Sequence, residues 1–232
     1  MIFNKRVNYF PVLSSLVDPI ENKTILDFGG NRGNLIYFSQ GKILQTNYTC
    51  IDVDTDSITH GEKEFPSATW IHWNRLHPWY NPTGFDVSFP VADTQFDIIW
   101  SHSVFTHLDI KETLYCLEQL LKLKGIVIFS FVSATNVSLI SRLVSLEELV
   151  LSPNNIKSIS NSSYSVVLDK SKLLLDTDDL IKTDYTQIWT FYSVDFLLNL
   201  ISNLTTQYNR RAEHTIAKGW NWIVIKPTLT II

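Results

Sequence analysis

The chain of 232 residues has few cysteines, no excess of positive charge and no long apolar run. Cys50 and Cys116 are its only two cysteines, too few for a disulfide framework or a cysteine-ligated zinc site, so we expect two buried, reduced thiols. The formal net charge of −4 argues against a protein that binds the phosphates of a nucleic acid. We therefore expect no nucleic acid partner.

No stretch approaches the ~20 apolar residues that a membrane-spanning helix needs. The strongest N-terminal apolar stretch, residues 10–17, contains Pro11 and is followed at once by Asp18 and Pro19. No A-x-A-like cleavage site follows it, so we expect neither a membrane segment nor a secretory signal. These absences predict a cytoplasmic protein.

Apolar side chains are abundant, with 45% hydrophobic and 18% charged residues. A chain of this composition can bury a sizeable core, which excludes wholesale disorder. The length fits one α/β domain that carries an insertion.

Short apolar runs alternate with helical patterns along the first half of the chain. Asp109 begins a helix with Glu112 at the capping-box spacing, and Gly125 lies where a left-handed C-cap belongs. Alternation of this kind predicts right-handed βαβ units and a doubly wound, mostly parallel sheet. The expected strands are residues 24–28, 48–52, 69–73, 96–100 and 126–132, and the earlier helices are residues 35–38 and 56–65.

The pattern changes at residue 133, where Asn, Ser and Thr become dense. We expect residues 1–232 to form a single domain in which residues 133–192 are an inserted, substrate-shaping segment. Within it, residues 164–175 alternate like a hairpin. Ser193 then caps a helix over residues 194–201, and residues 220–225 close the chain as a strand. The remaining charged clusters are interpreted as solvated: Asp176, Asp178, Asp179, and the pair Arg210 and Arg211.

A glycine-rich loop follows the first expected strand, where ligands bind in open α/β sheets. Its glycines are Gly29, Gly30 and Gly33, which do not form the G-x-G-x-x-G pattern of a nicotinamide-binding loop. The preceding carboxylate, Asp27, would repel a pyrophosphate but suits a ligand with an amino group. Asp52 ends the second strand, where an acid can accept both hydroxyls of a ribose. Together these features favour an adenosyl ligand with a cationic tail.

These residues resemble the class I S-adenosylmethionine-dependent methyltransferases. The similar stretches are LDFGGNRG at residues 26–33, CIDVD at 50–54, FDIIWS at 96–101 and LLKLKGIVI at 120–128. The resemblance covers residues 20–135, with a tail from residue 193 onward. The strings YNPTG at 80–84 and SVFTHL at 103–108 look like one subset of bacterial members. The resemblance implies a Rossmann-like, seven-stranded sheet with S-adenosylmethionine as the cofactor.

The resemblance also implies a role for each residue of the cofactor site. Asp27 would meet the amino end of the cofactor through the loop, where Gly29, Gly30 and Gly33 give access to the backbone. Asp52 would bind the ribose hydroxyls, Val53 and Asn74 would face the adenine, and Ser101 would lie beside the methionine portion. Asn31 stands where the family usually has its middle glycine. Asparagine tolerates the left-handed conformation better than other non-glycine residues, so the turn can survive.

Two histidines follow the fourth expected strand, near the expected position of the methyl group. His102 or His107 could take a proton from a hydroxyl or an amine at neutral pH. The alternatives are that His107 only makes backbone hydrogen bonds at a helix entry, and that the acceptor needs no base. We expect no metal site from these residues with His72 and His77, because none has a His or carboxylate partner at helical i, i+4 spacing.

An aromatic stretch, WIHWNRLHPWY at residues 70–80, is open to two interpretations. It either packs as a strand followed by a rigid loop, or it stacks on the adenine or covers the substrate.

The leading hypothesis is a methyltransferase of class EC 2.1.1.- that methylates an oxygen atom by in-line transfer. The acceptor would be a small molecule, a glycan or a peptide carboxylate, with natural product biosynthesis as one setting. The main alternative is a catalytically silent binding module with this fold, which the Asn31 departure supports. A nicotinamide-dependent oxidoreductase is a third and weaker option, because the glycine pattern is missing. The oligomeric state stays open, a homodimer being one option.

Overall fold

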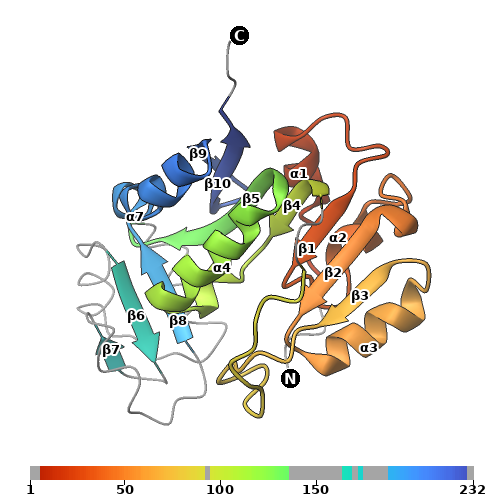
Figure 1. Ribbon diagram of the computed structural model, residues 1–232, viewed down its shortest axis with the longest axis horizontal. Helices are drawn as coiled ribbons and strands as arrows, with labels where there is room; N and C mark the ends of the chain where they lie inside the picture. The colour runs from red at the N-terminus through yellow and green to blue at the C-terminus, as the bar shows by residue number, and fades with distance from the viewer. Residues whose placement is uncertain (1–5, 92–94, 136–163, 169–171, 175–187, 229–232) are drawn as a thin grey trace. The chain divides into compact units, whose positions relative to one another are not determined.

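The computed structural model describes residues 6–91, 95–135, 164–168, 172–174 and 188–228. The chain divides into two compact units. The first unit contains residues 1–102 and 123–126, and the second contains residues 103–122 and 127–232. Figure 1 gives the labels of their helices and strands.

Four parallel strands form the centre of the first unit, in the order β3-β2-β1-β4. All four residues of β1 are buried, as expected for a central strand. The predicted strands and helices of this region are confirmed to within about two residues, the usual uncertainty of element ends. The strands are β1 (Ile25–Phe28), β2 (Tyr48–Asp52), β3 (Thr69–His72) and β4 (Gln95–Ser101).

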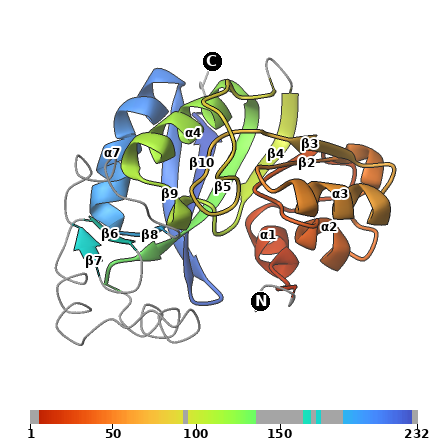
Figure 2. The same cartoon turned by 90° about the horizontal axis from the view of Figure 1, so that it is seen from below.

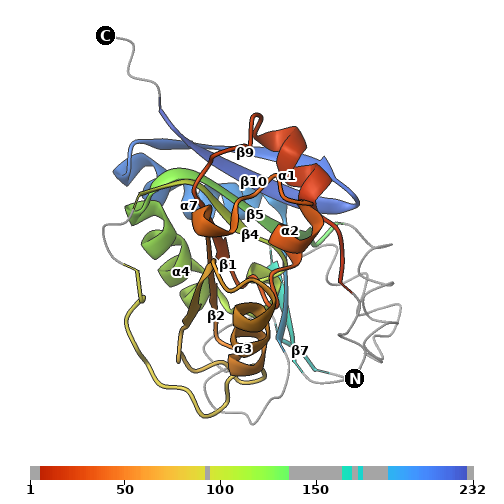
Figure 3. The same ribbon diagram turned by 90° about the vertical axis from the view of Figure 1, so that its right-hand side faces the viewer.

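The helices of the first unit lie on one face of these strands, as Figures 2 and 3 show from two directions. α3 packs against β2 and β3. At this contact the Trp70 ring is so close to Gly61 that a β-carbon there would lie 2.2 Å from it. The elements are α1 (Phe10–Leu16), α2 (Asn34–Phe38), α3 (Thr55–Glu64) and a short 3₁₀ helix, η1 (Gln45–Asn47).

The prediction for Gly125 is wrong. This residue is part of strand β5 (Lys124–Ser133) and has a φ of 120°, outside the left-handed helical region of a C-cap. A β-carbon on Gly125 would lie 2.1 Å from the carbonyl oxygen of Phe96 in β4. The glycine is therefore needed for the close approach of two backbones.

The second unit combines strand β5 with five further strands. β5 pairs in parallel with β8 and in antiparallel fashion with β10, which also pairs with β9. The predicted hairpin is confirmed by the antiparallel pairing of β6 with β7, and β6 also pairs with β8. The bounds are β6 (Tyr164–Leu168), β7 (Lys172–Leu174), β8 (Ile188–Tyr192), β9 (Arg210–Ala217) and β10 (Trp220–Pro227).

Helices α4 (Ile110–Lys122) and α7 (Val194–Gln207) pack on each other, and α7 also packs on β9. Both predicted caps are confirmed: Asp109 accepts the N–H of Glu112 at 2.8 Å, and Ser193 accepts the N–H of Phe196 at 3.2 Å. A 3₁₀ helix, η2 (Phe105–His107), precedes α4. Neither of the longest described helices, nor any other in the described ranges, is long and apolar enough to cross a membrane.

Two strands are absent from the sequence-based expectations. β8 lies at the end of the segment interpreted as an insertion, and β9 contains Arg210 and Arg211, interpreted as a solvated pair. Asp176, Asp178 and Asp179 lie outside the described residues, as does most of segment 133–192, so the insertion stays a prediction. Both cysteines are buried thiols outside any disulfide, as predicted.

Candidate functional site

The glycine-rich loop leaves β1 through a sharp turn. Gly29 has a φ of 69° and donates its N–H to the Ile51 carbonyl of β2 at 2.7 Å. Gly33, with a φ of 75°, precedes α2. Asn31 has a φ of 52°, so the residue that departs from the family pattern adopts the left-handed conformation that asparagine tolerates. The turn is thus formed with the residues that this chain has.

Asp27 lies buried beneath this loop, with 3% of its surface exposed. Its Oδ2 accepts the hydroxyl hydrogen of Tyr48 at 2.5 Å. A β-carbon on Gly30 would lie 2.7 Å from Asp27 Cγ and 2.8 Å from Cys50 Sγ, so the loop rests directly on this carboxyl group. Burial raises the pKa of Asp27 to about 7.

Asp52 connects the end of β2 to the same loop. Its Oδ2 accepts the N–H of Asn31 at 2.8 Å, and its Oδ1 accepts the N–H of Asp54 at 2.9 Å. The side chain is half-buried. Removal from water raises its pKa to about 6, although both N–H groups favour the charged form.

Val53 and Asn74 follow β2 and β3, at the same ends of these parallel strands. The half-buried Val53 has its carbonyl oxygen 3.1 Å from His72 Nε2. Asn74 is exposed, and its Oδ1 accepts a hydrogen from Asn81 Nδ2 at 3.0 Å.

The loop after Asn74 contains the YNPTG sequence, residues 80–84. Asn81 Nδ2 also donates to the Arg75 carbonyl at 3.0 Å, and Asn81 exchanges two backbone hydrogen bonds with His77. His77 is buried, and its Nδ1 accepts the N–H groups of Trp79 at 3.2 Å and Tyr80 at 3.1 Å. These bonds support the interpretation of the aromatic stretch as a structured loop.

The end of β4 adds a buried hydroxyl. Ser101 is fully buried, and its Oγ has no hydrogen-bond partner among the described residues. Trp100 of β4 is paired with Asp27 of β1, so Ser101 lies one residue beyond Asp27 toward the carboxyl end of the neighbouring strand. The adjacent His102 ring stacks on the Tyr9 ring, with centroids 3.7 Å apart.

The two candidate bases belong to different units. His102 ends the main segment of the first unit, whereas His107 lies in η2 of the second unit, is largely buried and donates its backbone N–H to Val104. No group of three or more His, Cys, Asp or Glu side chains is arranged for a metal ion within the ranges that the structure describes.

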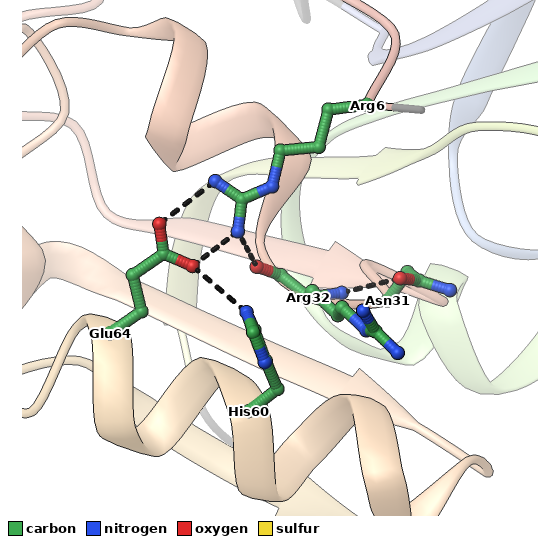
Figure 4. Close-up of polar contacts among 5 residues, drawn as sticks. All are labelled: Arg6, Asn31, Arg32, His60 and Glu64. Carbon is green, nitrogen blue, oxygen red and sulfur yellow. Dashed lines mark hydrogen bonds and ion pairs between the residues drawn. The ribbon is translucent and has the colours of Figure 1, made fainter. Parts of the chain in front are cut away.

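One contact to the loop has no signal in the sequence. Arg6 donates to Glu64 Oε1 at 2.9 Å, bonds with its second nitrogen to Glu64 Oε2, and reaches the Arg32 carbonyl at 3.5 Å (Figure 4). Its guanidinium lies 4.0 Å from the centre of the Tyr37 ring. Arg6 lowers the pKa of Glu64 below its ordinary value. No periodicity or motif relates residues 6 and 64, so only the folded chain reveals this cluster.

Comparison with known proteins identifies the part of the chain that carries this site. Residues 26–127 match a family model described as a methyltransferase domain. This match covers less than half of the chain and includes the glycine-rich loop, all but the first residue of β1, and strands β2 to β4. The resemblance predicted from the sequence is thereby confirmed.

Solved structures show a similar fold over nearly the whole chain. A glycopeptide N-methyltransferase complexed with sinefungin has a TM-score of 0.57 at 8% identity, over 97% of this chain and 95% of that one. An S-adenosylmethionine-dependent methyltransferase from Mesorhizobium loti has a TM-score of 0.52 at 10% identity, over 93% of this chain and 95% of that one.

Magnesium protoporphyrin IX methyltransferase from Synechocystis PCC 6803, with bound SAH, has a TM-score of 0.50 at 11% identity, over 96% of this chain and 88% of that one. The Rossmann-like, mostly parallel α/β fold is confirmed by these likenesses. No curated protein sequence matches the chain.

Proposed function

We propose that this protein binds S-adenosylmethionine at the loop of residues 29–33 and transfers its methyl group to an acceptor, an activity of class EC 2.1.1.-. The observation that carries the proposal is the pair of carboxylates, Asp27 and Asp52, that hold this loop from two neighbouring strands. A pyrophosphate cofactor would be repelled by Asp27, which lies directly beneath the loop. An adenosyl group with an amino acid tail suits both carboxylates: its ribose hydroxyls can bond to Asp52, and its amino group can approach Asp27.

Two further features fit this cofactor. Gly30 has no room for a β-carbon, so the loop backbone lies directly against the Asp27 carboxyl group. Ser101 Oγ is a buried polar atom without a partner among the described residues, and such atoms usually pair with a ligand or water. Both features lie in the first unit, with the two carboxylates.

Each predicted contact is compatible with the hydrogen bonds already made. A carboxylate oxygen accepts about two hydrogen bonds, so Asp52 can hold Asn31 and Asp54 and still accept from the two ribose hydroxyls. Asn74 Oδ1 accepts from Asn81 and has a second lone pair for the adenine amino group. Val53 would pack on the adenine ring, and Ser101 would bond to the methionine portion.

When bound, the cofactor supplies an electrophilic methyl group on a sulfonium. Asp27 and Asp52 orient it, and a side chain beside the acceptor has to receive a proton if the acceptor is a neutral hydroxyl. We assign this role to His102, held by its stack on Tyr9, with His107 as the second candidate. A carboxylate acceptor would need neither histidine.

We therefore propose O-methylation of a small molecule, a glycan or a peptide carboxylate. The alternative of a silent binding module drew its support from Asn31. Asn31 adopts a left-handed turn and donates its N–H to Asp52, which favours the methyltransferase over this alternative. Cytoplasmic location and natural product biosynthesis remain part of the proposal.

The acceptor class is tested by transfer of a labelled methyl group to hydroxyl compounds, glycans and peptides with free carboxylates. For a hydroxyl acceptor, His102→Gln should lower kcat by roughly 100-fold, as removal of a general base does, with unchanged cofactor affinity. His107→Gln is the matched variant that separates the two candidates. Methylation of a nitrogen atom would contradict the proposed O-methylation. With a hydroxyl acceptor, equal kcat values in His102→Gln and His107→Gln would contradict the assignment of the base to His102.

A further inference from the structure

Tyr48 is a buried tyrosine whose hydroxyl bonds to a charged group of the site. It begins β2, is 1% exposed, and donates to Asp27 Oδ2 at 2.5 Å. Its ring packs edge-on against Trp70, with centroids 5.9 Å apart. Trp70 in turn lies against Gly33 of the loop and Gly61 of α3, so the ring on which Tyr48 packs is itself fixed. The hydroxyl can therefore hold Asp27 in one orientation.

The other groups that face Asp27 do not favour its charged form. Cys50 lies beside it on β2, and burial and the two nearby carboxyl groups raise the pKa of this thiol, so it stays neutral. Asp52 is a second carboxylate, which repels the charge of Asp27. No Lys, Arg or His of the described residues forms an ion pair with Asp27. The Tyr48 hydroxyl is thus the group that compensates for burial of this carboxylate.

We propose that Tyr48 is a positioning residue for cofactor binding, which keeps Asp27 in its carboxylate form and aimed at the loop. The proposal rests on the proposed function, since the cofactor is the ligand that Asp27 serves. Tyr48 would act through Asp27 and need not touch the cofactor.

The electrostatics of Asp27 predict in which direction its pKa changes when the Tyr48 hydroxyl is removed. Burial raises the pKa of Asp27 to about 7, and the Tyr48 hydrogen bond opposes this rise. Without that bond the pKa should rise further, because the charged form loses a donor. Asp27 would then stay protonated up to a higher pH than in the wild type. Over that pH range it would bind a cationic ligand poorly.

The test is a calorimetric titration with S-adenosylhomocysteine between about pH 6 and pH 9, on wild type and on Tyr48→Phe. If loss of the hydrogen bond raises the pKa of Asp27 by about one unit, the variant should bind the ligand about five-fold more weakly at pH 7. At pH 9 its affinity should be within about two-fold of wild type. A merely structural role would lower the affinity equally at every pH. The amino group of the ligand and Asp52 titrate alike in both proteins, so the difference between the two curves reports Tyr48.

Two further proteins complete the test. Tyr192→Phe removes another buried hydroxyl, which lies 3.1 Å from Thr113 Oγ1 in the second unit, and should leave the pH curve unchanged. Asp27→Asn has no carboxyl group at this position, so the change in ligand affinity with pH that depends on Asp27 should be absent. If Tyr48→Phe does not fold, a carbon-13 titration of the wild-type aspartate carboxyls replaces it, and Asp27 should titrate near pH 7.

Equal pH curves for wild type and Tyr48→Phe would overturn the proposal, as would a wild-type Asp27 that titrates well above pH 7, because Tyr48 would then not keep it in the carboxylate form. A folded wild type that binds no S-adenosylhomocysteine at any pH would instead overturn the proposed function. The two failures are therefore distinguishable.

Discussion

Asp27 and Asp52 differ in how their surroundings support a negative charge. Asp52 accepts two backbone N–H groups, whereas Asp27 is buried with one hydroxyl donor. Because the pKa of Asp27 is higher in the folded chain than its ordinary value of 3.8, this residue contributes less to folding stability as pH rises from about 4 to about 7. Such a carboxylate is typical of a functional site. The sequence could predict that both acids lie at strand ends, but not this difference, which arises from the burial of Asp27 beneath the loop.

Gly30 should tolerate no side chain, because of its contacts with Asp27 and Cys50. A methyl group at Gly30→Ala would lie 2.7 Å from Asp27 Cγ and 2.8 Å from Cys50 Sγ, so the loop has to move away from the carboxylate. We expect a loss of stability of about 1–3 kcal/mol, typical of overpacking, and at least a ten-fold loss in affinity for S-adenosylhomocysteine.

Calorimetry and thermal unfolding measure both effects. Gly41→Ala is the control, because nothing lies within 4 Å of its added carbon; unlike Gly30, Gly41 has a positive φ, of 86°. The control should lose stability through backbone strain and keep its affinity. An unchanged affinity in Gly30→Ala would show that the loop does not depend on its contact with Asp27.

Elements were predictable where their own residues carried the pattern. β1 and β5 are short or continuous apolar runs, and α4 and α7 begin at polar caps. β9 was missed because, among the described strands, it pairs only with β10. Three of its eight residues are exposed and none is buried, so its apolar face is weak. A signal did exist: Lys218 and Gly219, with φ of 50° and 78°, form a two-residue hairpin turn before β10.

The N-terminal segment is an element whose role depends on contacts far along the chain. Arg6→Ala removes the bonds to Glu64 and the contact with the Arg32 carbonyl. Because this ion pair is near the surface, global stability should fall by no more than about 1 kcal/mol. Amide exchange in residues 29–33 should rise roughly five-fold, since the loop loses an anchor to α3.

Hydrogen exchange followed by mass spectrometry measures this local effect. Arg211→Ala is the matched control, because it removes an arginine ion pair with Glu213, 3.2 Å long, at a hairpin remote in sequence from the loop. Exchange in residues 29–33 that is unaffected by Arg6→Ala would show that the N-terminal segment does not restrain the loop.

At the scale of the whole molecule, the cofactor residues predicted from the sequence fall in one compact unit, from Asp27 to Ser101. Parallel strands bring their carboxyl ends to one edge of a sheet, which explains why residues spread over about 75 positions could be grouped without a structure. The two candidate bases could not be ranked in this way, because His102 and His107 lie after the last strand of that unit. Their ranking depends on the acceptor, which the fold does not determine.

The most direct measurement is a calorimetric titration of the purified protein with S-adenosylhomocysteine, repeated on Asp52→Ala. We predict one site with micromolar affinity in the wild type, lost in the variant because the ribose hydroxyls and the Asn31 N–H lose their acceptor. Circular dichroism would verify that both proteins are folded. A folded wild-type protein that does not bind S-adenosylhomocysteine would contradict the proposal that this chain is a methyltransferase.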